Sequence, residues 1–464
     1  MPDTVRPGSE SPRMDPISSP LLTDLYELTM LKAYFESGMT DTAVFELFAR
    51  KLPRDRNFFL FAGLEQALAF VERLRFSQRE LEWIEASGLF DHDFVRRLES
   101  FRFTGDIHAM PEGSVFFPDE PVLRVTAPMP EAQLLETRVL NLIHFETVIA
   151  SKAARSVLAA GGKKLIDFGL RRAHGAEAGL LAARASYLAG FDGTSTVLAA
   201  PLFGIPIFGT MAHSFVQAHD SEIDSFADFA KAFPKNAVLL IDTYDTVEAA
   251  RKAVTLAGRL RSRGISVRGV RLDSGDLDDL SRKVRKVLDA GGLREAIIFA
   301  SGNLDEYRVA RLVGAGAPID SFGIGTSLVT SSDAPALDAV YKLQEYAGRP
   351  RRKRSAGKAT WPGRKQVYRL SDAGGAFVRD IVAPASEVRE GEPLLQLVMK
   401  EGKRVASPSL EAARAHTQTQ LAKLPERCRK LEPAEPPYPV EIAASLKTLA
   451  EELDRASAVD ASAA

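Results

Sequence analysis

Cysteine is almost absent from this sequence. Among the 464 residues, Cys428 is the only one. A single thiol excludes an intrachain disulfide framework and any zinc site made from clustered cysteines. It is also typical of a reducing compartment, so we expect a cytoplasmic protein.

Long apolar runs and an excess of charge of one sign are also missing. No segment approaches the ~18 consecutive apolar residues of a membrane-spanning helix. Residues 1–19 lack the apolar stretch of a signal peptide. Lysine and arginine number 60 against 61 aspartates and glutamates, whereas nucleic-acid binders usually carry a basic excess. We therefore expect neither a membrane nor a nucleic acid as a partner.

Several catalytic signatures are missing as well. The sequence has no HExxH motif, no P-loop GxxxxGK[ST] and no GxSxG. These absences disfavour a zinc protease, a P-loop nucleotide hydrolase and a serine hydrolase of the nucleophile-elbow type.

The residues that are present indicate a large α/β protein. Hydrophobic residues make up 45%, enough for a sizeable core, and this length suggests two or three domains. Apolar spacing predicts helices at 23–35, 57–73 and 134–158, and short strands at 105–127 and 390–398. We expect a disordered tail over 1–19, an outer α/β domain from 20–130 and 340–435, a barrel over 131–339, and a C-terminal helix and tail over 436–464.

The middle of the chain repeats a strand-like pattern. Short apolar runs occur at 165–169, 195–200, 205–210, 237–243, 267–274, 296–301 and 319–326, and most precede a helix-like stretch. Buried strands alternating with helices predict a parallel sheet. Because no glycine-rich dinucleotide turn follows the first strand, we expect an irregular, TIM-like β/α barrel of about seven strands.

The ends of these runs are polar, and in such barrels the active site lies at the carboxyl ends of the strands. Ser195 opens its apolar run, whereas the other candidates lie near or beyond the ends of theirs. The strand-end residues are Asp167, Arg171, Arg172, Thr210, His213, Asp242, Asp245, Arg271, Asp273, Asp276, Ser301–Asn303 and Gly323–Thr326. No lysine is among them, which disfavours a Schiff-base aldolase.

Two strand-end loops have the composition of a phosphate site. Ser301-Gly302-Asn303 and Gly323-Ile324-Gly325-Thr326 each lead into a helix-like stretch, and free backbone N–H groups in such loops can hold phosphate. The glycines alone could also serve only to make tight turns.

Acidic residues next to these loops suit Mg²⁺, which takes one or two carboxylates together with substrate oxygens. Asp242 and Asp273 are the candidate ligands, and Asp276 could instead cap a helix. His213 follows a predicted strand and can be a base, a ligand or a phosphate acceptor; His219 is a weaker candidate. The basic stretch 349–365 is interpreted as a solvated loop, or as one that meets pyrophosphate or ATP across a dimer.

The ordered set of motifs resembles the nicotinate phosphoribosyltransferase family. The similarity runs from about Leu21 to Arg369, and more weakly to about Pro433. The motifs are TDLYELTM, DFGLRRA, GTMAHSF, LIDTYDT, VRLDSGD, SGNLDE, FGIGTSLVT and PGRKQVYR. The resemblance implies a type II phosphoribosyltransferase fold and a homodimer with shared active sites. It also implies that nicotinate and phosphoribosyl pyrophosphate react to give nicotinate mononucleotide and pyrophosphate, coupled to ATP hydrolysis through a phosphohistidine at His213.

The resemblance also assigns roles to single residues. Tyr26 from the neighbouring subunit and Phe168 would stack on the two faces of the pyridine ring. Arg271 and Thr210 match residues near the nicotinate carboxylate, and Arg171 and Ser195 complete the expected nicotinate site. Ser301, Gly302, Asn303, Gly323, Gly325 and Thr326 would hold the 5′-phosphate. Asp273 would stabilise the sugar cation or, with Asp242, help to place Mg²⁺.

Three alternatives remain at the level of sequence. A nicotinamide phosphoribosyltransferase shares the fold, but in those relatives an aspartate stands at the position of Ser195. A quinolinate phosphoribosyltransferase has a shorter chain and should carry more basic residues for its dicarboxylate substrate. A non-catalytic interaction protein on the same barrel is disfavoured by the intact set of His213, Arg271, Asp273 and the phosphate loops.

Overall fold

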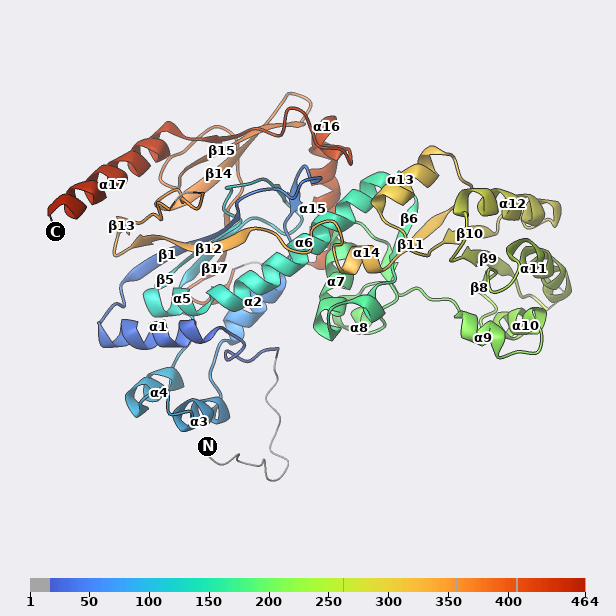
Figure 1. Ribbon diagram of the computed structural model, residues 1–464, viewed down its shortest axis with the longest axis horizontal. Helices are drawn as coiled ribbons and strands as arrows, with labels where there is room; N and C mark the ends of the chain where they lie inside the picture. Colours follow the sequence, from blue (N-terminus) through green and yellow to red (C-terminus); the bar gives the residue numbers. More distant parts are fainter. Residues whose placement is uncertain (1–16, 262, 356, 406–407, 464) are drawn as a thin grey trace.

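The computed structural model describes residues 17–261, 263–355, 357–405 and 408–463. Most of the tail expected over 1–19 lies outside these residues. The chain forms an outer lobe from both chain ends and a lobe around a parallel sheet, joined by one long helix (Figure 1). Within the described residues, no helix is both long and apolar enough to cross a membrane.

The main sheet of the outer lobe takes strands from both ends of the chain, as the sequence predicts. Its order is β13-β12-β1-β5-β3-β17-β18. β1 pairs antiparallel with β12 and β5, and β3 lies between β5 and β17. The strands are β1 (Thr42–Ala49), β3 (Asp106–Ala109), β5 (Leu123–Pro128), β12 (Ala339–Tyr346), β13 (Arg349–Pro350), β17 (Gln396–Lys400) and β18 (Lys403–Arg404).

Two smaller sheets and several helices complete this lobe. One sheet has the order β16-β14-β15-β19 and the other pairs β2 with β4. Their strands are β2 (Phe59–Leu60), β4 (Val115–Phe116), β14 (Lys365–Ser371), β15 (Phe377–Pro384), β16 (Glu392–Pro393) and β19 (Val440–Ile442). The helices are α1 (Leu25–Glu36), α2 (Leu64–Arg73), α3 (Gln78–Ala86), α4 (His92–Glu99), α15 (Leu410–Lys423), α16 (Glu426–Arg429) and α17 (Ala444–Ala463).

Two helix predictions need correction at their starts. The helix expected over 57–73 begins only at Leu64, because Phe59–Leu60 forms β2 and Gly63 turns the chain with a φ of +94°. The helix expected over 23–35 begins at Leu25, after Asp24 at the N-cap. The Asp24 side chain makes no capping bond, because its carboxylate accepts from the Thr137 hydroxyl at 2.9 Å.

The two lobes share α6 (Glu136–Ala160), which follows the short α5 (Met129–Leu134). This helix of 25 residues packs against α2 and β12 in the outer lobe, and against α7, α13 and α14 in the other (Figure 1). Its buried face includes charged side chains, among them Lys152 and Arg155. From the amphipathic pattern alone, such charged residues would be predicted at the surface.

The second lobe is built on a six-stranded parallel sheet of order β7-β6-β11-β10-β9-β8. Five of the seven predicted strands are confirmed: β6 (Lys164–Asp167), β8 (Ala237–Leu240), β9 (Val267–Leu272), β10 (Ile297–Ala300) and β11 (Ser321–Ile324). The helical segments are η1 (Leu170–Arg172), α7 (Ala176–Ala189), α8 (Ala199–Phe203), α9 (His213–Gln217), α10 (Glu222–Ala232), α11 (Thr246–Arg261), α12 (Leu277–Ala290), α13 (Glu306–Gly314) and α14 (Thr326–Val329).

The expectation of an irregular β/α barrel of about seven strands is confirmed only in part, because the parallel sheet has six strands. The sheet is a half-barrel whose edges are β7 (Gly193–Thr194) and β8, and these two do not pair within the described part of the chain. The run 195–200 enters α8, and 205–210 contributes only an isolated bridge from Ile207 to Thr194. Short apolar runs do not distinguish strand from helix, and Pro201 and Pro206 lack the N–H that a ladder needs.

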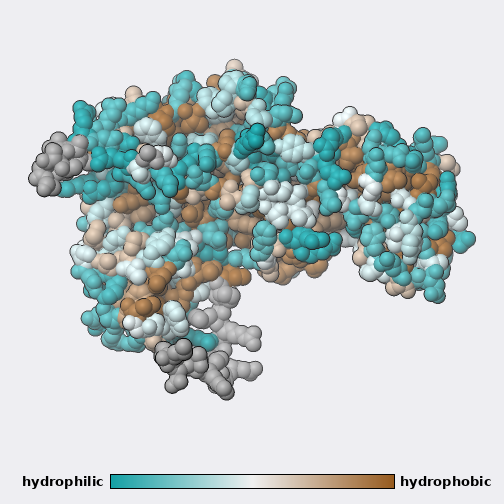
Figure 2. Space-filling model, viewed as in Figure 1, coloured by the Kyte–Doolittle hydropathy of each residue, from teal (hydrophilic) through white to brown (hydrophobic). Residues whose placement is uncertain are grey.

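Exposed apolar side chains gather in two places. One group lies at the start of α1 and comprises Leu22, Leu25 and Tyr26; Figure 2 shows apolar surface around this helix, at the lower left. The other surrounds α8 and comprises Val197, Leu198, Leu202, Ile207 and Phe208. Contiguous exposed apolar groups are typical of interaction surfaces.

Candidate functional site

Arg271, near the end of β9, is the hub of the strand-end residues. Its Nε donates to Ser301 Oγ at 3.0 Å, and its Nη1 donates to Thr210 Oγ1 at 2.8 Å and to the carbonyl of Met211 at 3.3 Å. Its Nη2 lies 3.2 Å from Asp273 Oδ1. These contacts use up to four of the five guanidinium N–H donors, so the side chain is held in place with one donor left for a ligand.

Asp273, just after β9, is held in its ionised form. Its carboxylate accepts from the Ser301 hydroxyl and pairs with Arg271. Burial by itself raises its pKa, but the bond from Ser301 and the charge of Arg271 outweigh burial and hold the pKa of Asp273 below its usual value. A carboxylate with low pKa suits the stabilisation of positive charge or the binding of a cation.

His213 and Asp242 complete this group. His213 is the first residue of α9; its Nδ1 lies 3.1 Å from Thr243 Oγ1, and its Nε2 lies 3.8 Å from Asp273 Oδ2 and 4.0 Å from Asp242 Oδ1. When Nδ1–H donates to Thr243, Nε2 keeps its lone pair and is the nucleophilic nitrogen. That nitrogen faces both carboxylates.

The carboxylates fit Mg²⁺ by their chemistry. Asp242 Oδ2 accepts from the backbone N–H of Asp273 at 3.0 Å and from the Ser274 hydroxyl, whereas its buried Oδ1 has no hydrogen-bond partner among the described residues. An unpartnered buried carboxylate oxygen can coordinate a cation. Within the described residues, no three acidic, histidine or cysteine side chains form a group that could hold a metal ion by themselves.

The other acidic candidates serve as helix caps. Asp276 accepts from the backbone N–H groups of Asp278 and Asp279 at the start of α12. Asp245 accepts from the N–H of Glu248 at 2.8 Å in α11. Both are turned to their own helices, which is the alternative that the sequence left open for Asp276.

The two glycine loops lie next to the acidic group. Gly302 has a φ of +93°, and a Cβ there would lie 1.8 Å from the carbonyl oxygen of Asp273. Only glycine allows this approach of the β10 loop to the β9 loop. The second loop starts α14, and Ser327 Oγ donates to the carbonyl of Leu304 at 2.6 Å, which ties the two loops together.

Phe168 lies between Arg271 and the second loop. The guanidinium carbon of Arg271 is 5.5 Å from the centre of its ring, and a Cβ on Gly323 would lie 2.8 Å from the ring edge. Buried Asp167 accepts from Gly169 N and Thr194 Oγ1, and this fixes the turn that carries Phe168. Burial raises the pKa of Asp167 to about 6.

Ser195 directly follows β7, so it ends a strand instead of opening one. Its backbone N–H donates to the carbonyl of Asp167 at 2.8 Å, and its side chain is half-buried. This places Ser195 beside the end of β6, next to the turn of Phe168.

Two predicted site residues are not joined to this group within one chain. Tyr26 lies on α1 in the outer lobe, far along the molecule from β9 and β10 (Figure 1), and 44% of its surface is exposed. Arg171 has an exposed side chain in η1. His219 turns away as well: its Nδ1 lies 2.7 Å from the carbonyl of Phe215.

Several basic residues of the stretch 349–365 form ion pairs within the outer lobe. Arg352 contacts Asp454 of α17 at 2.9 Å and Arg364 contacts Glu345 at 2.7 Å. Lys365 is buried and lies 2.7 Å from Glu46.

Some residues around the site were not foreseen from the sequence. Thr243 positions the imidazole of His213, and its place in LIDT, directly after a strand-end aspartate, is the signal that could have identified it. Lys152, buried on α6, contacts segments that follow both glycine loops. A lysine inside the apolar run TVIASKAA is the only sequence hint of it.

Known protein families match most of this sequence. Three family models match the chain: the nicotinate phosphoribosyltransferase (NAPRTase) N-terminal domain over 21–144, the nicotinate phosphoribosyltransferase (NAPRTase) family over 163–352, and the nicotinate phosphoribosyltransferase C-terminal domain over 385–450. Together they cover most of the chain.

Individual relatives agree with these matches. The chain is 50% identical over 424 residues to nicotinate phosphoribosyltransferase pncB2 of Mycobacterium tuberculosis, and the match covers 91% of each chain. It is 34% identical to nicotinate phosphoribosyltransferase of Homo sapiens, and that match covers 96% of this chain and 98% of the human one. The crystal structure of human nicotinic acid phosphoribosyltransferase superposes with a TM-score of 0.84 at 32% identity, covering 93% of this chain and 99% of that one.

Proposed function

Because the chain belongs to the nicotinate phosphoribosyltransferase family, we propose that it joins nicotinate to phosphoribosyl pyrophosphate and releases nicotinate mononucleotide and pyrophosphate in NAD biosynthesis. The observation that carries the proposal is the Arg271 hub, which joins Thr210, Ser301 and Asp273 beside the Phe168 ring. A cation, a carboxylate and an aromatic face lie next to one another there, and this combination supports the binding of a pyridine carboxylate beside an activated ribose.

The chemistry follows from charge. As the bond between the anomeric carbon and pyrophosphate breaks, positive charge develops on the sugar and negative charge on the leaving group, while the ring nitrogen of nicotinate attacks. Ionised Asp273 stabilises the sugar, and Arg271 directs its remaining donor to the nicotinate carboxylate. Asp242 and Asp273 would hold Mg²⁺, which neutralises charge on pyrophosphate oxygens when bound.

Phosphate and ring binding are assigned to the neighbouring elements. Backbone N–H groups of the loops Ser301–Asn303 and Gly323–Thr326 hold the 5′-phosphate, assisted by the start of α13. Phe168 stacks on one face of the pyridine ring. Ser195 donates its hydroxyl to the nicotinate carboxylate, and Arg171 lies at the rim of the same site.

ATP is proposed as a further substrate that phosphorylates His213. The bond between the β- and γ-phosphates of ATP breaks, a bond from phosphorus to Nε2 forms, and ADP leaves; water later hydrolyses the phosphohistidine. The contact from Nδ1 to Thr243 leaves Nε2 free to attack. Nε2 points at the carboxylates that would hold the metal.

We further propose a homodimer in which Tyr26 covers the pyridine ring in the site of the partner subunit. Within one chain, Tyr26 and Phe168 belong to different lobes. The exposed apolar groups at α1 and around α8 provide the two halves of a self-complementary interface. Such an interface brings α1 of one subunit to the half-barrel of the other.

Product analysis tests the assigned activity. The purified protein is incubated with phosphoribosyl pyrophosphate and Mg²⁺, with nicotinate or nicotinamide, and with or without ATP. We expect nicotinate mononucleotide as the main product, formed faster with ATP. Equal or greater formation of nicotinamide mononucleotide would instead assign the chain to nicotinamide, and the absence of both products would remove the catalytic proposal.

Complementation tests the shared site. Tyr26→Ala and Asp273→Ala chains are each expected to be nearly inactive, but a co-expressed mixture should recover about a quarter of the wild-type activity, because half of randomly formed dimers are mixed and each mixed dimer has one native site. Two differently tagged Asp273→Ala chains serve as the control and should recover none. If isolated mixed dimers are no more active than their parents, each site is built within one chain.

A further inference from the structure

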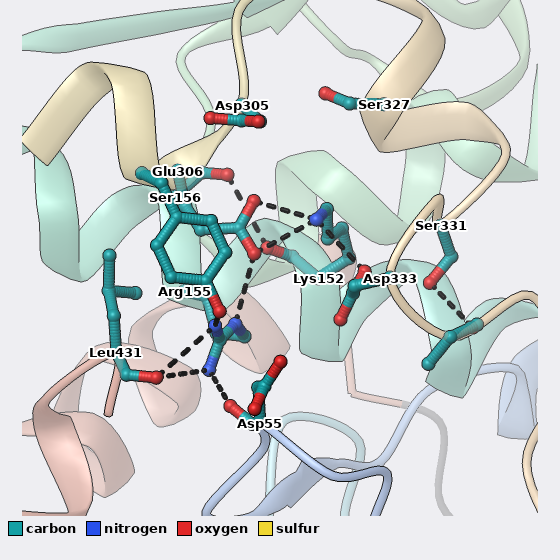
Figure 3. A network of polar contacts seen from close by, with 12 residues as sticks. Asp55, Lys152, Arg155, Ser156, Asp305, Glu306, Ser327, Ser331, Asp333 and Leu431 are labelled. Atoms are coloured by element: carbon teal, nitrogen blue, oxygen red, sulfur yellow. Dashed lines mark hydrogen bonds and ion pairs between the residues drawn. The ribbon is translucent and has the colours of Figure 1, made fainter. Parts of the chain in front are cut away.

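A buried group of charges includes two carboxylates from the segments that follow the two proposed phosphate loops. It consists of Lys152 and Arg155 on α6, Glu306 at the start of α13, Asp333 after α14, and Arg56 from the outer lobe; we name it the Lys152 cluster. The side chain of Lys152 is 2% exposed and that of Glu306 is fully buried. Figure 3 shows Lys152 between Glu306 and Asp333.

Lys152 is the member that contacts both carboxylates. Its Nζ lies 2.7 Å from Glu306 Oε2 and 2.9 Å from Glu306 Oε1, and also 2.9 Å from Asp333 Oδ1. Each carboxylate has a second cation of its own: Arg155 Nε lies 3.1 Å from Glu306 Oε1, and Arg56 Nε lies 3.0 Å from Asp333 Oδ2. The two arginines hold one carboxylate each, whereas Lys152 joins them.

Each carboxylate is fixed to one of the loops. Glu306 is the first residue of α13, which begins directly after the Ser301–Asn303 loop. Asp333 follows α14, which begins at the end of the Gly323–Thr326 loop. Arg56 also donates to Ser331 Oγ, in the turn that leads from α14 to Asp333. Lys152 therefore links the segments that follow the two loops.

Stability alone does not explain such a cluster. Removing charges from water is costly, and apolar side chains of similar volume stabilise a core equally well or better. What hydrogen-bonded charges add is fixed geometry. The neighbouring Arg56 and Lys152 outweigh burial and hold the pKa of Asp333 well below its usual value, so Asp333 remains ionised and paired.

We propose that Lys152 is a positioning residue for phosphoribosyl pyrophosphate, which sets the relative position of the two phosphate loops by bridging Glu306 and Asp333. The inference rests on the proposed assignment of these loops to the 5′-phosphate. Backbone donors must converge on one phosphate group, and a misplacement of about 1 Å weakens several hydrogen bonds at once. Lys152 touches no substrate itself.

The test replaces Lys152 by methionine, which keeps the length and loses the charge. We expect KM for phosphoribosyl pyrophosphate to rise about tenfold or more, while kcat and KM for nicotinate change by less than about threefold. Asp333→Asn weakens the contact of Lys152 with this residue and keeps the cations Lys152, Arg155 and Arg56. It should also raise KM for phosphoribosyl pyrophosphate. The double variant should be no worse than Lys152→Met alone, because both changes remove one bridge.

Arg369→Met is the control, since Arg369 is an equally buried cation paired with Asp380 in the outer lobe. It should lower the melting temperature by a similar amount and leave KM for phosphoribosyl pyrophosphate within about twofold. If Lys152→Met and Asp333→Asn lower only the melting temperature, or raise both KM values equally, Lys152 is structural and the inference is overturned.

A third variant separates this inference from the loop assignment. Thr326→Val alters the Gly323–Thr326 loop itself and leaves the Lys152 cluster intact. If it raises KM for phosphoribosyl pyrophosphate while Lys152→Met does not, the loops bind phosphate and the positioning role fails. If neither variant changes that constant, the assignment of the loops fails first, and the positioning role fails with it.

Discussion

Replacing Ser195 by aspartate is expected to lower kcat/KM for nicotinate by at least about a hundredfold, with nicotinamide use unchanged or improved. An aspartate there would face the nicotinate carboxylate. Two like charges about 4 Å apart repel by about 4 kcal/mol at an effective dielectric of about 20. Nicotinamide has a neutral amide that can donate to the aspartate. Steady-state kinetics with both substrates at saturating phosphoribosyl pyrophosphate measures the change.

Ser195→Ala is the control for this prediction. It removes the hydroxyl without adding charge. It should lower kcat/KM for nicotinate by about tenfold or less, as expected for the loss of one hydrogen bond. We expect only a partial reversal of preference in Ser195→Asp, because Arg271 would remain in the site. An unchanged nicotinate kcat/KM in a folded Ser195→Asp protein would show that Ser195 does not face the carboxylate.

His213→Asn should abolish labelling of the protein by the γ-phosphate of ATP, and with it the stimulation by ATP. The expected label is stable in base and labile in acid, as a phosphoramidate is. Slow ATP-independent transfer should survive, because Arg271, Asp273 and the phosphate loops do not depend on the imidazole. Incubation with ATP labelled at the γ-phosphate, followed by base and acid treatment, measures the first effect.

His219→Asn is the matched control and should retain full labelling. The His219 imidazole contacts the carbonyl of Phe215 and lies 3.7 Å from Asp228, on the side where α9 packs against α10. A label that persists in His213→Asn and disappears in His219→Asn would reverse the assignment of the phosphorylated residue.

Most of the strand ends could be predicted from the sequence because their pattern is local. Apolar runs ending in LID, RLDS, FAS and GIGT place Asp242, Asp273, Ser301 and Gly325 after strands, and parallel strands bring such ends to one edge. Because these ends share one edge, the sequence predicts that Arg271, Thr210 and Asp273 lie close together. It does not predict which of them contacts the others. Only the three-dimensional structure shows that Arg271 contacts four groups at once.

What could not be predicted depends on distant pairing. The segment 195–210 has the composition of two strands, but its prolines and the turn at Gly204, with a φ of +72°, direct it into a short helix and a loop, and the sheet stays open. The sequence predicts Lys152 to be a surface residue of a helix. Its partners Glu306 and Asp333 cannot be recognised, because they lie more than 150 residues further along the chain. No local pattern encodes such a contact.

The seven-stranded sheet of the outer lobe has a consequence for synthesis on the ribosome. The first strands made, β1, β5 and β3, pair with one another, but their outer neighbours β12 and β17 come from residues 339–346 and 396–400. A growing chain therefore carries a three-stranded sheet with two unpaired edges while the whole parallel half-barrel is being translated. Unpaired edges promote association between chains. The emerging chain thus passes through a long aggregation-prone interval, which ends only when the C-terminal strands leave the exit tunnel.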